Sequence, residues 1–264
     1  MNYNNWYQII KKHLGNYKKE VLKINENGTF RNKEYSHIIP KELGSKNYLR
    51  SSFEKLVLKK HPDWYHMNSS QTVCVNFFAV LDNNELSKLM SAILNREILV
   101  KQAEFEYTPV KNSSNYDYYI QDINGNNYYF EIKYSESTID KKSKASDKSD
   151  AYEKYYKNDV KSNPIFKNIT ENDFMTNHFQ AYRNMVKGKG DDYSIFITMR
   201  SNEGTYNELK SALEDLRVKD AHNTILLYWE NLINDVMELF KDKAELVSYY
   251  KEFKDKYIPS FIEG

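Results

Sequence analysis

The spacing of apolar residues along the chain predicts helices in its N-terminal part. Apolar positions recur at helical intervals over residues 3–14 and 47–60, and Pro62 follows the second of these segments. A polar, turn-rich passage over 25–45 separates them. The next segment, 70–81, is almost continuously apolar, and the segment 84–98 after it is amphipathic. Together they predict a buried helical hairpin.

Strand-like patterns begin after residue 100. Three runs, 103–110, 116–122 and 127–134, alternate apolar and polar positions, and Asn124-Gly125 lies between the last two as a hairpin turn. Helices are then predicted over 171–186, 207–216, 231–240 and 244–257, and strands over 193–199 and 224–228. The Ser-, Lys- and Asp-rich stretch 135–149 predicts an excursion without a packed element. This order predicts an α/β fold, in which a mixed sheet has helices on both faces.

Length and composition narrow the class of protein. The 264 residues predict a basic, mainly helical region over 1–65 and a domain over 66–264 with C-terminal helices, or one continuous domain. The one cysteine, Cys74, excludes an internal disulfide and a cysteine-rich zinc site and favours a reducing compartment, so we expect a cytoplasmic protein. The apolar runs are too short for a bilayer, so we expect no membrane association.

Charge is distributed unevenly. Residues 1–60 contain 13 Lys and Arg against 5 Asp and Glu, whereas the remainder contains 25 against 32. A basic end on a nearly neutral protein is typical of a polyanion-binding surface, although a solvated face of Lys-rich helices has the same composition. We therefore expect the N-terminal stretch and the Lys-rich segment Lys141 to Lys161 to contact a phosphate backbone.

The meander carries the candidate chemistry. Glu131 and Lys133 are two apart on the third strand and point to the same face, and the hairpin brings Asp117 of the second strand alongside. Two carboxylates and an ammonium group are a hard oxygen site for a divalent cation, most naturally Mg²⁺ with Mn²⁺ as a substitute. Such a site can polarise a phosphodiester and activate water. An exposed Glu and Lys also occur on strands that bind no metal, but the neighbouring Asp and the following helix and strand favour the metal site.

These residues resemble those of the PD-(D/E)XK nuclease superfamily, and more narrowly its restriction-endonuclease-like branch. The resemblance covers roughly residues 66–200, and the proline of the superfamily's name is replaced by Asn115-Tyr116 before Asp117. The segments that carry it are Ser69-Ser70-Gln71, Asn76-Phe77-Phe78, Glu106-Tyr107-Thr108-Pro109, Glu131-Ile132-Lys133-Tyr134-Ser135-Glu136, Gln180 and Arg183-Asn184. The resemblance implies a restriction-endonuclease-like core of helix, three-strand meander, helix and strand. It also implies that Asp117 and Glu131 hold magnesium and that Lys133 assists the attacking water.

The resemblance extends the predicted site to three further residues. Glu106 on the first strand would be an additional metal ligand, with Glu104 on the same strand face as the competing choice. Gln180 and Arg183 are three apart on a predicted helix and share a face. The resemblance implies that Arg183 binds a phosphate and that Gln180 holds a water or a group of the substrate strand.

The sequence therefore predicts a magnesium-dependent endonuclease that hydrolyses DNA, with a role in restriction or defence implied by the resemblance alone. Cleavage of both strands requires two active sites, which a homodimer would supply. Two alternatives remain open at this point. One is a non-catalytic nucleic-acid-binding or interaction module on the same fold, and the other is an RNA-directed nuclease, because metal chemistry does not read the sugar.

Overall fold

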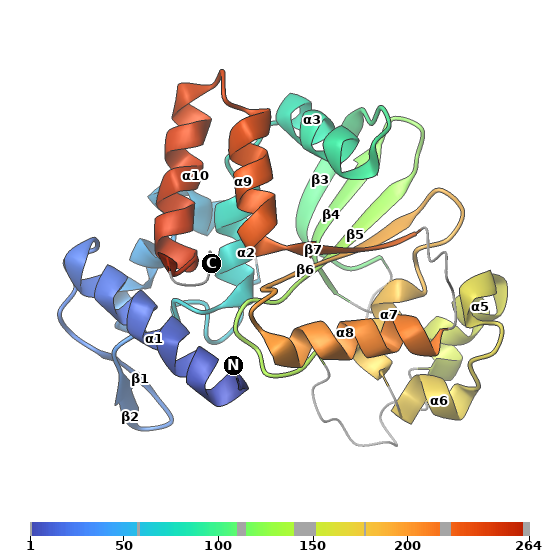
Figure 1. The fold of residues 1–264 in the computed structure, drawn as a ribbon, viewed down its shortest axis with the longest axis horizontal. Coiled ribbons are helices and arrows are strands. Elements are labelled where there is room, and N and C mark those ends of the chain that lie inside the picture. Colours follow the sequence, from blue (N-terminus) through green and yellow to red (C-terminus); the bar gives the residue numbers. More distant parts are fainter. Residues whose placement is uncertain are drawn as a thin grey trace.

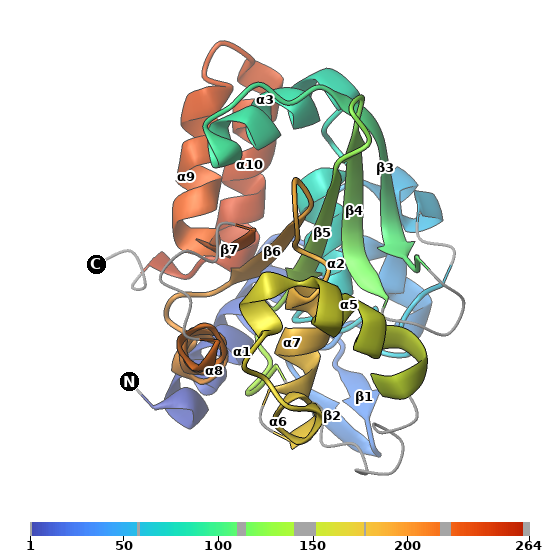
Figure 2. The ribbon, with the colours of Figure 1, turned by 90° about the vertical axis from the view of Figure 1, so that its right-hand side faces the viewer.

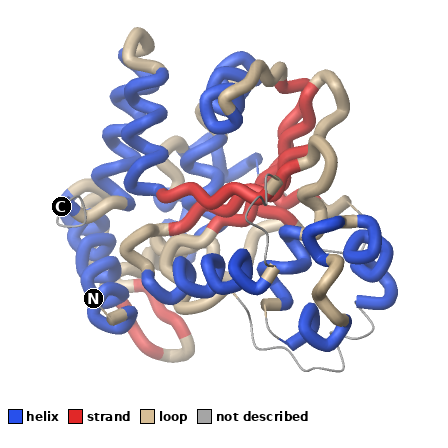
Figure 3. Tube along the Cα trace, turned by 45° about the vertical axis from the view of Figure 1, so that its right-hand side comes forward, coloured by secondary structure: helices blue, strands red, loops and turns tan. Residues whose placement is uncertain are grey.

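The computed structural model describes residues 2–56, 59–109, 115–139, 152–176, 178–216 and 223–260. A five-stranded sheet in the order β3-β4-β5-β6-β7 lies at its centre (Figure 3). The strands are β3 (Val100–Tyr107), β4 (Tyr116–Asp122), β5 (Asn127–Ile132), β6 (Tyr193–Thr198) and β7 (Thr224–Tyr228). The β3-β4-β5 meander is antiparallel, whereas β6 pairs parallel to β5 and β7 pairs parallel to β6, so the sheet is mixed.

Helices surround this sheet (Figure 1). They are α1 (Tyr3–Glu20), α2 (Ser70–Phe78), α3 (Asn83–Leu94), α5 (Lys157–Ser162), α6 (Glu171–Thr176), α7 (Phe179–Met185), α8 (Glu203–Asp215), α9 (Trp229–Leu239) and α10 (Ala244–Tyr257). Short 3-10 helices occupy Lys41–Asn47, Ser51–Leu56 and Pro164–Phe166, and a π-helix occupies Tyr152–Tyr156. A small hairpin of β1 (Gly28–Phe30) and β2 (Lys33–Tyr35) lies beside α1.

The alternation of side chains along the strands builds two apolar layers. Ile120, Phe130 and Ile195 belong to the large core that also contains α1, α2, α9 and α10. Phe196, the next residue on β6, instead belongs to a second cluster with residues of α5 to α8. Figure 2 shows α5 to α8 on one side of the sheet and α9 and α10 on the other. The helices on both faces confirm the predicted α/β architecture.

The N-terminal region shares the main core. Trp6, Ile10 and Leu14 of α1 are fully buried in the same cluster as residues of β5 and α10. Helix α1 packs against α10, which in turn packs against α9 and α2. The terminal helices therefore pack on the central core. No helix within the described ranges combines the length and the apolar character that a bilayer-spanning segment needs.

Several predicted elements are confirmed closely. Strands β4 and β7 have the predicted bounds, and Gly125 adopts φ of +87° in the turn between β4 and β5. Helix α2 is buried on nearly every side, as its apolar sequence predicts, but it packs on β4, β5 and α10, while α3 packs on β3 and α9. The two helices thus cover different parts of the sheet.

Other predictions were wrong in detail. The helix predicted over 47–60 is replaced by short 3-10 helices, because Asn47 and Tyr48 are drawn into the core: the Asn47 side chain donates to the carbonyls of Trp64 and His66. The helix predicted over 171–186 is two helices, α6 and α7. The phosphate contact predicted for the Lys-rich segment 141–161 stays a prediction, because residues 141–151 lie outside the described residues; residues 152–161 are helical.

Candidate active site

Asp117, Glu131 and Lys133 come together where strands β4 and β5 end their pairing. The pairing of β4 with β5 ends at Tyr118 and Phe130. Asp117, which precedes Tyr118, and Glu131, which follows Phe130, occupy the next position beyond this pair. The Asp117 carboxylate replaces the missing ladder bond by accepting the N–H of Ile132 at 2.6 Å. The Lys133 N–H donates to the carbonyl of Ile197 at 2.9 Å, which fixes this residue against β6. The strand geometry thus brings the three predicted side chains to one place.

Glu131 is the most extensively bonded member of this group. Lys133 Nζ lies 2.8 Å from Glu131 Oε1, and the side chains of both residues are less than 10% exposed. From α7, Gln180 Nε2 donates to Oε1 at 3.1 Å and Asn184 Nδ2 donates to Oε2 at 2.8 Å. One ammonium and two amides therefore hold both oxygens of this carboxylate in a fixed orientation.

Arg183 supplies a further positive charge from α7. Its Nε atom is buried and has no hydrogen-bond partner among the described residues. Burial disfavours the charged form of Glu131, but Lys133 and Arg183 outweigh it and hold the pKa of Glu131 below its usual value. The structure thus places both predicted α7 residues, Gln180 and Arg183, near Glu131. It also adds Asn184, which the spacing of four residues from Gln180 on the same helix could have indicated.

Asp117 is the carboxylate with the least compensation. It is only partly buried and lines a groove of about 860 Å³ together with Lys133 and Glu136. Desolvation and the nearby negative charge of Glu131 raise the pKa of Asp117 well above its usual value. Burial lowers the pKa of Lys133, whereas the surrounding carboxylates, Glu131 first, raise it. The carboxylates together have the larger effect, so the pKa of Lys133 lies above its usual value. Negative charge is therefore crowded around Asp117, which lines the groove.

Glu106 lies next to this group but is engaged elsewhere. Its Oε1 accepts from Gln71 Nε2 of α2 at 2.7 Å, its Oε2 accepts from the side-chain amide of Asn115, and His61 Nε2 lies 3.7 Å from Oε2. The residue adopts φ of +56°, a conformation that is unfavourable by about 1–2 kcal/mol for a side chain with a Cβ. Glu104, the competing choice, is exposed on the outer strand of the sheet.

The segment after Lys133 is fixed by Glu136, an acid to which the sequence prediction assigned no role. Glu136 Oε2 accepts the N–H groups of Tyr134 and Ser135 at 2.8 and 3.0 Å, and Ser70 Oγ of α2 donates to Glu136 Oε1 at 2.5 Å. Ser70 Oγ also accepts from the N–H of Tyr134. This network ties the end of β5 to the start of α2. Ser70 and Glu136 both lie in segments that carry the resemblance, but no pattern in the sequence indicated that they contact each other.

The donor set fits a small divalent cation. Mg²⁺ is usually bound through one or two carboxylates, with the remaining positions taken by waters and substrate phosphate oxygens. Asp117 and Glu131 supply the carboxylates, and the charge crowding around Asp117 is what a cation would relieve. Within the described ranges, no group of three or more His, Cys, Asp and Glu side chains is placed to hold one ion, which agrees with Glu106 being bonded to Gln71 and Asn115.

A mixed sheet with helices on both faces and an Asp, Glu and Lys group at the end of its meander defines a restriction-endonuclease-like protein. The family model described as Restriction Endonuclease associating with ARP matches residues 11–258, and the chain belongs to this family. Comparison with curated proteins and with solved structures finds no match. The family is one of restriction endonucleases, so the chain is of the nuclease type.

Proposed function

We propose that the protein is a metal-dependent endonuclease that hydrolyses phosphodiester bonds of DNA, acting in restriction or defence against foreign DNA. The observation that carries this proposal is the Glu131–Lys133 ion pair, held by α7, next to the partly exposed Asp117 carboxylate in an open groove. Membership in a family of restriction endonucleases supports DNA as the substrate.

Each side chain has a distinct role in this proposal. Asp117 and Glu131 would hold Mg²⁺, with Mn²⁺ as a substitute, and Glu106 would be a further ligand after leaving Gln71 or Asn115. When bound, the ion polarises a phosphate oxygen and lowers the pKa of a water. The Lys133 ammonium donates to the attacking water or to the phosphate oxygen that gains charge. Gln180 and Asn184 keep Glu131 oriented, because they donate to its two oxygens.

Arg183 adds a positive charge near Glu131 that can bind the substrate phosphate. Its planar group can bind a phosphate through two parallel hydrogen bonds, and its buried Nε has no partner in the part of the chain that the structure describes. A substrate phosphate near Glu131 would supply that partner. The cytoplasmic location and a homodimer with two active sites remain predictions of the sequence.

The test of this proposal compares nucleic acids and metals. Supercoiled DNA, linear duplex DNA and structured RNA are incubated separately with the full chain and Mg²⁺, Mn²⁺, Ca²⁺ or EDTA. We expect cleavage of DNA with Mg²⁺ or Mn²⁺ and none in EDTA. Cleavage of RNA alone would replace the DNA substrate by RNA, and binding to DNA without cleavage under any metal would favour a non-catalytic module.

A further inference from the structure

Helix α1 carries a continuous line of aromatic and basic side chains on one side. Tyr3, Tyr7 and Lys11 are four residues apart, so they follow one another along the helix surface. The rings of Tyr3 and Tyr7 are stacked, with centroids 5.5 Å apart and an interplanar angle of 13°. Lys11 Nζ lies over the Tyr7 ring at 4.6 Å from its centroid. The three side chains therefore form one connected column.

The first end of this column lies in the candidate active site. Tyr3 and Tyr7 line the same 860 Å³ groove as Asp117 and Lys133. The Tyr3 hydroxyl donates to the carbonyl of Ser135 at 2.8 Å, which attaches the start of α1 to the segment directly after Lys133. The Tyr7 hydroxyl accepts a long hydrogen bond of 3.4 Å from Asn68, and its proton has no acceptor within the described ranges. Tyr7 thus presents a donor to the groove.

The other end of the column lies in a basic hollow. Lys11, Lys12 and Lys19 line a cavity of about 340 Å³ beside the β1-β2 hairpin, together with Gln8, Asn16 and Tyr35. Glu34 is the one carboxylate in that lining. None of the three lysines forms an ion pair with a carboxylate in the part of the chain that the structure describes. Their charges are therefore available to an external anion.

The opposite side of α1 keeps the helix rigid. Trp6, Ile10 and Leu14 are fully buried, and Trp6 Nε1 donates to Ser201 Oγ at 2.9 Å. A helix fixed in this way presents its polar side at constant spacing. Figure 1 shows α1 running beside β1 and β2, away from the sheet.

From this arrangement we propose that α1 is a track for the phosphate backbone of the DNA that flanks the cleaved bond. The inference rests on the proposed nuclease function, and it gives the path along which the DNA extends from the groove. Residues 3 to 19 span about 24 Å at 1.5 Å per residue. At 3.4 Å per nucleotide, this length matches about seven nucleotides of one DNA strand. A small anion would need one pocket only, whereas charges and donors spread over this distance match a polyanion.

The rings of Tyr3 and Tyr7 stack on each other, Lys11 covers the Tyr7 ring, and the Tyr3 ring also contacts Trp6. The track therefore contacts phosphates through the Tyr7 hydroxyl and the lysines, and it does not stack on bases. Contacts of this kind add affinity without reading sequence, and their number sets the salt dependence of binding.

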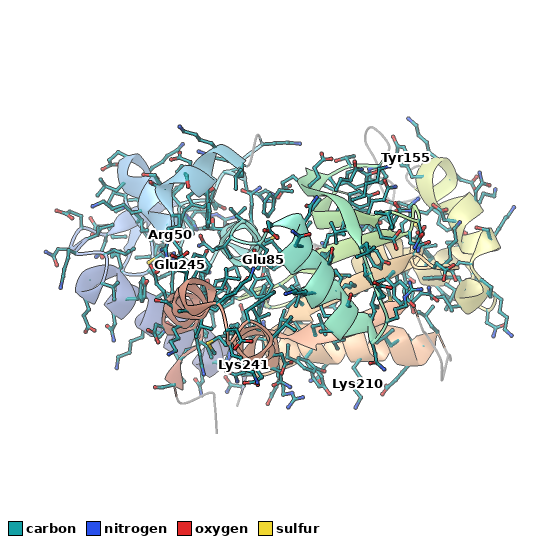
Figure 4. The ribbon with its side chains drawn as sticks, turned by 90° about the horizontal axis from the view of Figure 1, so that it is seen from above. Arg50, Glu85, Tyr155, Lys210, Lys241 and Glu245 are labelled. Atoms are coloured by element: carbon teal, nitrogen blue, oxygen red, sulfur yellow. The ribbon has the colours of Figure 1, made fainter. Side chains whose placement is uncertain are left out.

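Binding of a fluorescein-labelled 30-base-pair duplex, measured by anisotropy in EDTA over a range of salt concentrations, tests this track without any cleavage. The test variant combines Lys11→Gln, Lys12→Gln and Lys19→Gln. The matched control combines Lys88→Gln, Lys210→Gln and Lys241→Gln, which remove the same charge from exposed positions on α3, α8 and the segment after α9. Figure 4 shows Lys210 and Lys241 at the protein surface. Thermal unfolding of both triple variants establishes that they are folded.

We expect the slope of log K against log salt to become less steep by about 2.7 in the test variant, or 0.9 for each lost phosphate contact. With equal affinities at 1 M salt, this slope change corresponds to about 500-fold weaker binding by the variant at 0.1 M salt. The control should keep most of the wild-type slope. A variant with Tyr7→Ala should lose about one contact because Lys11 loses its support, while Tyr7→Phe should weaken binding and leave the slope unchanged.

Equal slopes of log K against log salt for the test and control variants would contradict a phosphate track on α1, even if the wild type cleaves DNA with Mg²⁺. A slope change confined to the test variant would support the track, even if no cleavage is found. The first result concerns α1 alone, whereas a lack of cleavage concerns the proposed catalytic group, so the two failures are distinguishable.

Discussion

The variant Lys133→Met separates the contribution of the buried ion pair to folding from its contribution to chemistry. Lys133 Nζ lies 2.8 Å from Glu131 Oε1, and both side chains are nearly inaccessible to solvent. Removing one partner of a buried pair is destabilising by roughly 3–5 kcal/mol, because the other charge stays buried without compensation. Gln180, Asn184 and the charge of Arg183 remain around Glu131, so we expect the lower end, about 3 kcal/mol.

The double variant Glu131→Gln, Lys133→Met removes the charges of both partners. Its free energy of unfolding should return to within about 1 kcal/mol of the wild type, because neither member of the pair is left charged without its partner. Its cleavage activity should not return. In the single variant, loss of one preorganised donor should lower kcat by about 10²- to 10³-fold.

Urea unfolding followed by tryptophan fluorescence in EDTA measures the stability of the wild type, the single variants Lys133→Met and Glu131→Gln, and the double variant. Plasmid cleavage with Mg²⁺ measures activity in the same four proteins. The reasoning is refuted if Lys133→Met is destabilised by less than about 1 kcal/mol and keeps activity within threefold of the wild type. It is also refuted if the double variant is as unstable as the sum of the single variants, because the pair would then carry no coupling.

Three further predictions concern residues around the site and in the core. Gln180→Ala and Asn184→Ala should each lower kcat about 10-fold with little change in KM, because each removes one donor that orients Glu131, and steady-state kinetics distinguish this from loss of substrate binding. Burial lowers the pKa of His37 to about 3, so below pH 6.5 the imidazole is protonated in the unfolded chain but stays neutral in the folded one. The free energy of unfolding should therefore fall by about 2 kcal/mol as the pH drops from 6.5 to 5. Urea unfolding of His37→Phe should no longer show this fall. Burial lowers the pKa of Lys256 to about 7, so the unfolded chain binds the extra proton between pH 7 and 10.5 and stability rises with pH in that window. Between pH 7 and 9 the rise should reach up to about 2.7 kcal/mol, and an unchanged slope in Lys256→Met would contradict the assignment.

The meander and its site could be predicted from sequence because their signals are local. Alternating aromatic and polar positions define β4 and β5, and Gly125 fixes the turn that joins them. The same two-residue period brings Glu131 and Lys133 to one face, and the antiparallel pairing brings Asp117 beside them. The helical spacing of Gln180 and Arg183 likewise predicts their common face.

The features that were not predicted depend on contacts between distant segments. Asn76 Oδ1 accepts the N–H of Leu49, and Lys256 Nζ donates to the Asn47 carbonyl, so the chain around residues 47–50 is held by α2 and α10 and does not form the predicted helix. The hydrogen bond between Gln71 and Glu106 joins residues 35 positions apart. Local propensity contains no information about such partners.

The most direct test of the proposed catalytic group is the rate of cleavage of supercoiled plasmid DNA by the wild type, Asp117→Asn and Lys133→Met, each with Mg²⁺ and with EDTA. Asparagine at 117 can still accept the N–H of Ile132 through its side-chain oxygen, so the fold is kept while the negative charge is lost. We predict Mg²⁺-dependent cleavage by the wild type and a decrease of at least about 10²-fold in both variants. Cleavage by the wild type in EDTA, or cleavage by both variants at the wild-type rate, would contradict the assignment of Asp117, Glu131 and Lys133 as the catalytic group.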